Sequence, residues 1–235
     1  MAEIGNGYGS ECHLLRYLGR HRELLDEQVL ATTGAQRIRW LDFDFDDSKP
    51  WGDAEPKGIG FVESPSVQNA WRRFWPQRGN PPNWDAVARI SRDGVSEWLL
   101  VEAKANIEEI ESSCGAAEKG GRSIIAGALD ATKAALGVAA DRDWLNGYYQ
   151  FANRVAFLRF LISAGEPARL LFIYFTGDPN PSGACPRDAE GWNEALGRQG
   201  AHIGLPSGHS LSTQIHKLFL DARPGGRAGV PWRNA

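Results

Sequence analysis

The chain has 235 residues with a formal net charge of −3, and 42% of its residues are apolar while 23% are charged. This length suits one sizeable α/β domain, and the charge gives no global basic signature for nucleic acid. No segment approaches the ~18 apolar residues of a membrane span, and the N-terminal residues lack the pattern of a signal peptide.

The number and spacing of the cysteines indicate the redox environment of the protein. The three cysteines, Cys12, Cys114 and Cys185, have no metal-like spacing, and their odd number argues against a disulfide framework. We therefore expect a soluble protein of the reducing cytoplasm, with no membrane partner. Oligomeric state cannot be inferred from these features.

The first predicted element is a helix over residues 10–31, in which leucines recur at roughly helical spacing. Glu11 near its start is expected to favour the positive end of the helix dipole. Residues 37–45 then alternate between apolar and polar side chains and predict a strand with one polar face.

A short helix over residues 67–75 follows, and it mixes cations with aromatic rings. Its Arg72 and Arg73 lie between Trp71, Phe74 and Trp75. Nucleic-acid-binding surfaces have this composition, but so does an amphipathic helix that packs its rings inward. Both interpretations stay open. The surrounding segment from residue 65 to 92 has five arginines and one acid, Asp85.

Two strands are predicted next, over residues 84–91 and 97–104, joined by a turn at 92–96. The second is an apolar run that ends in Glu102-Ala103-Lys104. Side chains alternate along a strand, so Glu102 and Lys104 lie on the same face. The hairpin brings Asp85, near the start of the first strand, close to both.

Two carboxylates beside one lysine have a specific chemistry. Hard oxygen ligands bind Mg²⁺ or Mn²⁺, often through one or two carboxylates with waters completing the shell. The ion and the ammonium group together can stabilise charge that develops on a phosphoryl oxygen. Asp85, Glu102 and Lys104 therefore predict a site for phosphodiester hydrolysis, with both carboxylates as metal ligands.

This arrangement resembles the PD-(D/E)XK nuclease superfamily, whose motif is an acid, a variable gap and then acid-x-lysine on the next strand. Here the matching residues are Asp85 and Glu102-Ala103-Lys104, although Trp84 replaces the usual proline. The resemblance covers mainly residues 83–176 and implies a restriction-endonuclease-like core. It also implies that an upstream acid completes the metal site, and Glu11 and Glu63 are the two candidates.

The longest periodic segment is a helix over residues 144–164 with a wide apolar stripe. Gln150 and Arg154 are four residues apart and share one face. In the superfamily this helix often directs a glutamine and a second polar or basic residue toward the site. We therefore expect Gln150 to position a catalytic group and Arg154 to bind a backbone phosphate, although a solvent-facing position for both stays open.

The remaining elements complete an α/β fold. A second apolar run predicts a strand at 169–176 beside the site strand, and helices are expected at 123–138, 187–196 and 211–220. We predict a mixed sheet of about four to five strands flanked by helices, in a single domain over residues 1–235. Its core spans residues 37–176, with the N-terminal helix before it and a helical extension at 187–235 after it.

The predicted function is a metal-dependent phosphodiester hydrolase of PD-(D/E)XK type that acts on nucleic acid, with DNA expected. Two alternatives stand beside it. One is a nuclease-like module that only binds nucleic acid, although clustered carboxylates facing phosphates argue against it. The other is a protein-interaction scaffold, for which the nine tryptophans could supply anchors.

Overall fold

The computed structural model of the chain describes residues 7–41, 44–45, 53–78 and 81–224. A five-stranded sheet in the order β1-β4-β5-β6-β7 forms the centre. β4 is antiparallel to both of its neighbours, β1 and β5, whereas β5, β6 and β7 run parallel to one another. The expected α/β class with a mixed sheet is confirmed. The strands of this sheet are β1 (Arg37–Trp40), β4 (Ala86–Arg92), β5 (Val95–Lys104), β6 (Ala168–Thr176) and β7 (Ile215–Asp221).

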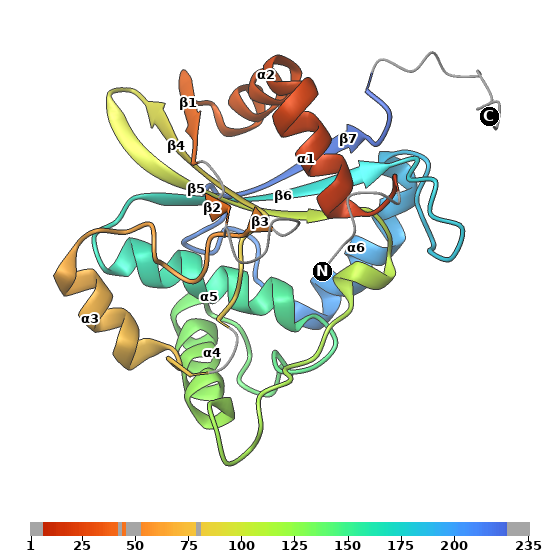
Figure 1. Ribbon diagram of the computed structural model, residues 1–235. Coiled ribbons are helices and arrows are strands. Elements are labelled where there is room, and N and C mark those ends of the chain that lie inside the picture. The colour runs from red at the N-terminus through yellow and green to blue at the C-terminus, as the bar shows by residue number, and fades with distance from the viewer. Residues whose placement is uncertain (1–6, 42–43, 46–52, 79–80, 225–235) are drawn as a thin grey trace.

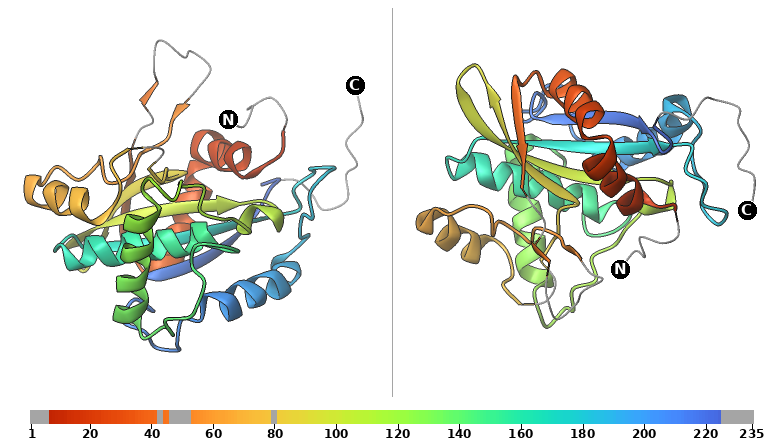
Figure 2. Two further views of the ribbon diagram at one scale, coloured as in Figure 1. Left: turned by 90° about the horizontal axis from the view of Figure 1, so that it is seen from below. Right: turned by 45° about the horizontal axis from the view of Figure 1, so that its top comes forward.

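Helices cover both faces of this sheet (Figure 1). α1 (Ser10–Arg20) and α2 (Arg22–Thr33) pack on one face, which we call the α1 face. The other, the α5 face, is covered by α5 (Tyr149–Ser163) together with α3 (Pro65–Phe74), α4 (Arg122–Leu136) and α6 (Ala189–Ile203). The two views of Figure 2 show the same division into layers.

The central position of β5 follows from its sequence. Leu99, Leu100 and Val101 are fully buried, since both faces of the strand are covered. Leu100 packs in the core under α5, whereas Leu99 and Val101 pack in the core under α1. By alternation Glu102 and Lys104 point, like Leu100, to the α5 face.

α5 is the crossover between the parallel strands β5 and β6. Nine of its residues are buried, so its apolar surface is wider than a single stripe. The adjoining 3₁₀ turn η2 (Glu108–Ile110) follows β5, and Glu109 accepts a hydrogen bond from the backbone of Ala105 at 2.8 Å. This contact satisfies a backbone donor just beyond the strand end.

Three boundary predictions are corrected. The predicted N-terminal helix is two helices, which meet at His21. The strand predicted at 37–45 ends at Trp40. Asp44–Phe45 is a separate strand, β2, which pairs with β3 (Asp53–Ala54) in a small second sheet. Residues 42–43 lie outside the described part of the chain.

The third correction concerns the C-terminal extension. The helix predicted at 211–220 is wrong, because Ile215–Asp221 is the strand β7, which pairs in parallel with β6. The sheet therefore extends beyond the predicted core of 37–176. The helix predicted from residue 187 is present as α6.

Two further findings concern the described residues as a whole. None of their helices has the length and apolar character needed to cross a membrane. All three cysteines are free thiols.

Candidate functional site

The two predicted carboxylates meet where β4 begins. Ala86 pairs with Val101, so Asp85, one residue earlier, lies opposite Glu102. The Asp85 carboxylate accepts a hydrogen bond from the backbone nitrogen of Ala103 at 2.5 Å. The predicted hairpin thus brings the acids of two adjacent strands together.

Glu102 is buried and bound on both sides by cations. Its Oε1 lies 2.6 Å from Nζ of Lys104, and its Oε2 lies 2.6 Å from Nε of Arg154. The side chain of Glu102 is only 2% exposed. Each oxygen of this carboxylate therefore has its own charged donor, one from β5 and one from α5.

Lys104 connects the carboxylates to α5. Its Nζ also donates a hydrogen bond to Oε1 of Gln150 at 3.1 Å. The backbone nitrogen of Gln150, at the first turn of α5, donates to the Ser112 hydroxyl at 2.8 Å. The prediction that Gln150 and Arg154 face the site is confirmed, and the solvent-facing alternative is excluded for both.

The ionisable groups of the site shift one another's pKa values. Burial, and after it the charge of Glu102, raise the pKa of Asp85 to about 8, although Lys104 opposes the shift. Burial alone would also raise the pKa of Glu102, but Arg154 and Lys104 hold it below its ordinary value. Burial opposes the charge of Lys104, yet Glu102 and Asp85 keep its pKa above the ordinary value. These shifts favour the charged forms of Glu102 and Lys104 and the protonated form of Asp85.

These side chains line a cavity of about 330 Å³, which we call the site cavity. It includes a carboxylate that the sequence did not single out, Glu55. The segment after Glu55 pairs with the segment before Asp85, since Trp84 N donates to Pro56 O at 2.9 Å. The cavity is lined by Glu55, Pro81, Pro82, Asn83, Asp85, Glu102, Lys104, Tyr149, Gln150, Asn153 and Arg154.

Glu11 reaches the same region from the α1 face. It lines a small second hollow together with Leu14, Leu15, Glu55 and Asp85. Of the two candidate upstream acids, the structure therefore places Glu11 beside Asp85. Its role as a metal ligand stays a prediction.

The start of α1 is held in place by a buried polar contact. Nε2 of His13 lies 2.8 Å from Oδ1 of Asp178, which follows β6, and both carboxylate oxygens of Asp178 are 3.3 Å from the backbone nitrogen of Gly9. Burial lowers the pKa of His13, although Asp178 opposes the shift. A neutral His13 that donates from Nε2 fits this geometry, and it fixes the helix that bears Glu11.

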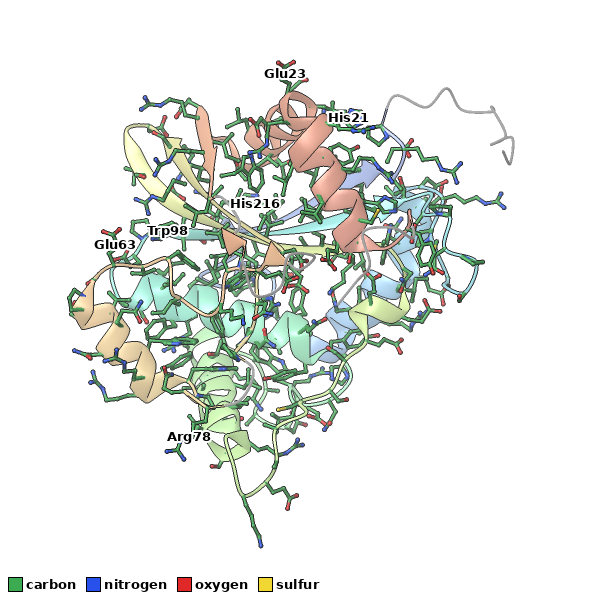
Figure 3. All side chains as sticks on the ribbon, viewed as in Figure 1. His21, Glu23, Glu63, Arg78, Trp98 and His216 are labelled. Carbon is green, nitrogen blue, oxygen red and sulfur yellow. The ribbon has the colours of Figure 1, made fainter. Side chains whose placement is uncertain are left out.

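Glu63 is not part of the site. Phe61 packs on Trp98 with 4.8 Å between ring centroids, and Trp98 precedes Glu102 by four residues of strand, about 13 Å. Glu63 is exposed, it does not line the site cavity, and Figure 3 shows it near Trp98, beside the start of α3. The prediction that it could join the metal ligands is corrected, because α3 begins near the opposite end of β5.

Arg154 has a different role from the one predicted. It is 4% exposed, and besides Glu102 it donates to the carbonyl of Asn83 at 2.5 Å and to Oδ1 of Asn153 at 2.9 Å. Its guanidinium also lies 4.6 Å from the centroid of the Trp84 ring. A residue bound in this way positions Glu102, so the predicted separate contact with a backbone phosphate is not supported.

The open question about residues 67–75 receives a mixed answer. Trp71 packs against Phe157 of α5 at 4.3 Å between ring centroids, so the rings of α3 face inward. Arg72 and Arg73 are exposed on its outer side and do not line the site cavity. Their contact with nucleic acid stays a prediction.

The donor set fits a hard cation. Within the described ranges, no three or more His, Cys, Asp or Glu side chains are arranged as they stand to hold a metal ion. Mg²⁺ nevertheless needs only one or two carboxylates besides water and substrate oxygens. Desolvation and the charge of Glu102 raise the pKa of Asp85, and a divalent cation can displace the proton that this shift favours. Asp85 and Glu102 would hold such an ion, with Glu55 and Glu11 next to Asp85.

Comparison of the chain with protein-family models, with curated proteins and with solved structures found no match.

Proposed function

We propose that this protein is a metal-dependent phosphodiester hydrolase of PD-(D/E)XK type that cleaves nucleic acid, with DNA as the expected substrate and Mg²⁺ or Mn²⁺ as the cofactor. One observation carries the proposal. The buried carboxylate of Glu102 and the half-buried carboxylate of Asp85 lie opposite each other on adjacent strands, and a charged lysine two residues after Glu102 binds it at 2.6 Å. A fold gains little stability from such a cluster, since buried ion pairs often cost as much as they return.

Each side chain has a distinct task in this proposal. Asp85 and Glu102 would hold the cation, which when bound would acidify water and neutralise charge on the phosphoryl oxygens. Lys104 stays protonated, so it acts as a hydrogen-bond donor and a positive charge rather than as a general base. Its ammonium group stabilises the charge that develops during attack on phosphorus.

The neighbouring residues keep this geometry. Gln150 accepts a hydrogen bond from Lys104 and so orients the ammonium group. Arg154 neutralises Glu102 and fixes the orientation of its carboxylate at the wall of the site cavity. The volume of the cavity, about 330 Å³, is enough for one phosphodiester group and its flanking sugars.

Calorimetric titration with Mn²⁺ tests the proposal. We expect one acidic site in the parent protein and loss of binding in Asp85→Asn and in Glu102→Gln. Glu23→Gln is the matched control, because Glu23 is exposed on α2, on the far side of the sheet (Figure 3). A Glu102→Gln protein that binds Mn²⁺ as the parent does would refute the metal site.

Cleavage is tested separately. Supercoiled plasmid, labelled single-stranded DNA and labelled RNA are incubated with the protein and Mg²⁺ or Mn²⁺. Nicking by the parent but not by Asp85→Asn supports the proposal. Metal binding by a parent protein that cleaves none of the three would contradict it and leave the binding-only alternative.

A further inference from the structure

Three arginines on the α5 face have no acidic partner. Arg39 of β1 pairs directly with Arg89 of β4, and Arg37 lies two residues before Arg39 on the same face. Among the described residues, no carboxylate lies within ion-pair distance of any of the three. Like charges directly opposite each other on neighbouring strands are destabilising.

Other arginines of the same sheet are neutralised. Arg92, three residues after Arg89, lies 3.6 Å from Glu97, and Arg169 of β6 binds Glu97 with 2.5 Å between Nε and Oε2. Of the arginines in the described strands of this sheet, only Arg37, Arg39 and Arg89 therefore lack an acidic partner, in a chain whose overall charge is −3. We call Arg37, Arg39 and Arg89 the arginine row.

Arg89 is held in a defined position. Its guanidinium lies 4.2 Å from the centroid of the Trp98 ring, and Trp98 is the partner of Arg89 across β4 and β5. The indole nitrogen of Trp98 in turn donates to Glu166 at 3.2 Å. A guanidinium stacked on a ring keeps its N–H groups free to bind an anion such as a phosphate. Arg37 and Arg39 are exposed on the edge strand beside it.

The arginine row has a fixed relation to the carboxylates. Asp85 and Glu102 are opposite residues on β4 and β5, and Arg89 and Trp98 are the corresponding pair four residues further along. Four residues of strand span about 13 Å. Since four is an even number, both pairs point to the same face. Along one nucleic-acid strand this separation corresponds to about four nucleotides at 3.4 Å each.

We propose that Arg37, Arg39 and Arg89 bind the phosphodiester backbone of nucleic acid about four nucleotides from the phosphate held at the carboxylates. The proposal rests on the proposed function and adds where the substrate lies and which side chains hold it. Charge complementarity selects the occupant, because three neighbouring cations without acids suit a chain of phosphates. Two acids lie near Trp98, at one end of the row, and such a strand must pass them: Glu166, which binds the Trp98 indole, and Glu63 (Figure 3).

The test measures binding alone, with EDTA present so that no metal is bound and no cleavage occurs. Fluorescence anisotropy with a labelled duplex gives the affinity as a function of salt concentration for the parent and for the double variant Arg37→Ala/Arg39→Ala. Both positions are exposed, so the variant should fold. Two lost phosphate contacts should lower the slope of log affinity against log salt by about 1.8. From about 50 to 200 mM salt, the parent should therefore lose about twelvefold more affinity than the variant.

Two further variants sharpen the result. Arg37→Lys/Arg39→Lys keeps both charges and should keep the parent slope. Arg20→Ala removes an exposed arginine from α1, on the opposite face, and should also leave the slope unchanged. The proposed role of the arginine row would be wrong if the double alanine variant kept the parent slope. It would also be wrong if that variant changed the slope no more than Arg20→Ala does.

Failure of this inference and failure of the proposed function can be told apart. A parent that binds DNA through the row but never cleaves it contradicts only the function. Suppose instead that the parent cleaves DNA in Mn²⁺ and the double alanine variant binds DNA as tightly as the parent does. This result contradicts only the proposed binding of nucleic acid by the arginine row. A parent that binds no nucleic acid contradicts both.

Discussion

Arg154 and Glu102 form a buried ion pair between α5 and β5, with 2.6 Å between Nε and Oε2. The same guanidinium donates to the carbonyl of Asn83, which precedes the strand β4, and lies over the ring of Trp84. One side chain thus ties the crossover helix to both strands that supply the carboxylates. The geometry of the site depends on how well α5 packs on the sheet.

The first prediction concerns how much the Arg154–Glu102 ion pair contributes to the stability of the fold. Arg154→Ala leaves the carboxylate of Glu102 buried with only Lys104 as a partner, and breaking a buried pair from one side costs about 3 kcal/mol or more. Urea denaturation measures the change. The double variant Arg154→Met/Glu102→Gln should lose less than the sum of the single variants Arg154→Met and Glu102→Gln, because neither member of the Arg154–Glu102 pair is left charged without the other. Equal stability of Arg154→Ala and the parent would show that the pair contributes nothing.

A second prediction follows from the pKa of Asp85, which burial and Glu102 raise to about 8. The folded protein binds the proton more tightly than the unfolded chain does, so the stability from this proton is fully present below about pH 4. It is lost as the pH rises through about 8. In EDTA, the free energy of unfolding should fall across this range, and Asp85→Asn should remove that part of the slope. An unchanged slope in Asp85→Asn would contradict the shift.

The third prediction separates metal binding from catalysis at Lys104. Its ammonium group binds Glu102 but is not itself a metal ligand, so Lys104→Ala should retain Mn²⁺ binding in calorimetry. The cleavage rate should fall by about 10² to 10³, the effect of one group that stabilises transition-state charge. Gln150→Ala should reduce the rate less, because it leaves the ammonium group present but poorly oriented. Cleavage by Lys104→Ala at the parent rate would exclude a catalytic role for the lysine.

Much of the fold could be predicted because its strongest patterns are local. The apolar run of β5 ending in Glu102-Ala103-Lys104, and the second run of β6, indicate central strands without any knowledge of their partners. The turn at Asp93-Gly94 fixes the hairpin, and with it the meeting of Asp85 and Glu102. Asp93 and Gly94 both adopt positive φ, at 50° and 81°, as a tight turn requires.

β7 shows why the rest could not be predicted. Leu211, Ile215, Leu218 and Phe219 recur at helical spacing, whereas the structure buries Leu218 and Leu220 in the alternation of a strand. Both periods are present in so short a segment, and only pairing with β6 decides between them. Pairing between distant segments also places Glu55 at the site, although Glu55 lies in a loop with no periodic signal. It lies there because the backbone nitrogen of Trp84 donates a hydrogen bond to the carbonyl of Pro56.

The last prediction concerns two buried tyrosines that differ in one contact. The hydroxyl of Tyr17 donates to the backbone carbonyl of Asp221 at 2.9 Å. The hydroxyl of Tyr174, the partner of Lys104 on β6, is the only buried side-chain nitrogen or oxygen in the described residues without a hydrogen-bond partner. Burial, and then the charge of Glu102, raise the pKa of Tyr174, so its proton stays on the oxygen.

The rings of both tyrosines are packed and should stay in place when the oxygen is removed. Tyr174 contacts Trp192 of α6 and Phe219 of β7, with ring centroids 5.0 and 5.7 Å away. An unsatisfied buried hydroxyl costs about 1 to 3 kcal/mol, whereas a satisfied one contributes about 0.5 to 1.5 kcal/mol. Tyr174→Phe should therefore raise the free energy of unfolding by about 1 kcal/mol, and Tyr17→Phe should lower it by a similar amount.

Urea denaturation of both variants beside the parent, with equal slopes against denaturant concentration, measures the difference. Because the two substitutions remove the same atom from equally buried rings, their opposite signs isolate the hydrogen bond as the cause. If Tyr174→Phe loses as much stability as Tyr17→Phe, the Tyr174 hydroxyl has a partner in solution. Since Lys104 pairs with Tyr174 across β5 and β6 and the charge of Glu102 acts on the Tyr174 hydroxyl, an ordered water that joins these groups to Tyr174 would be that partner.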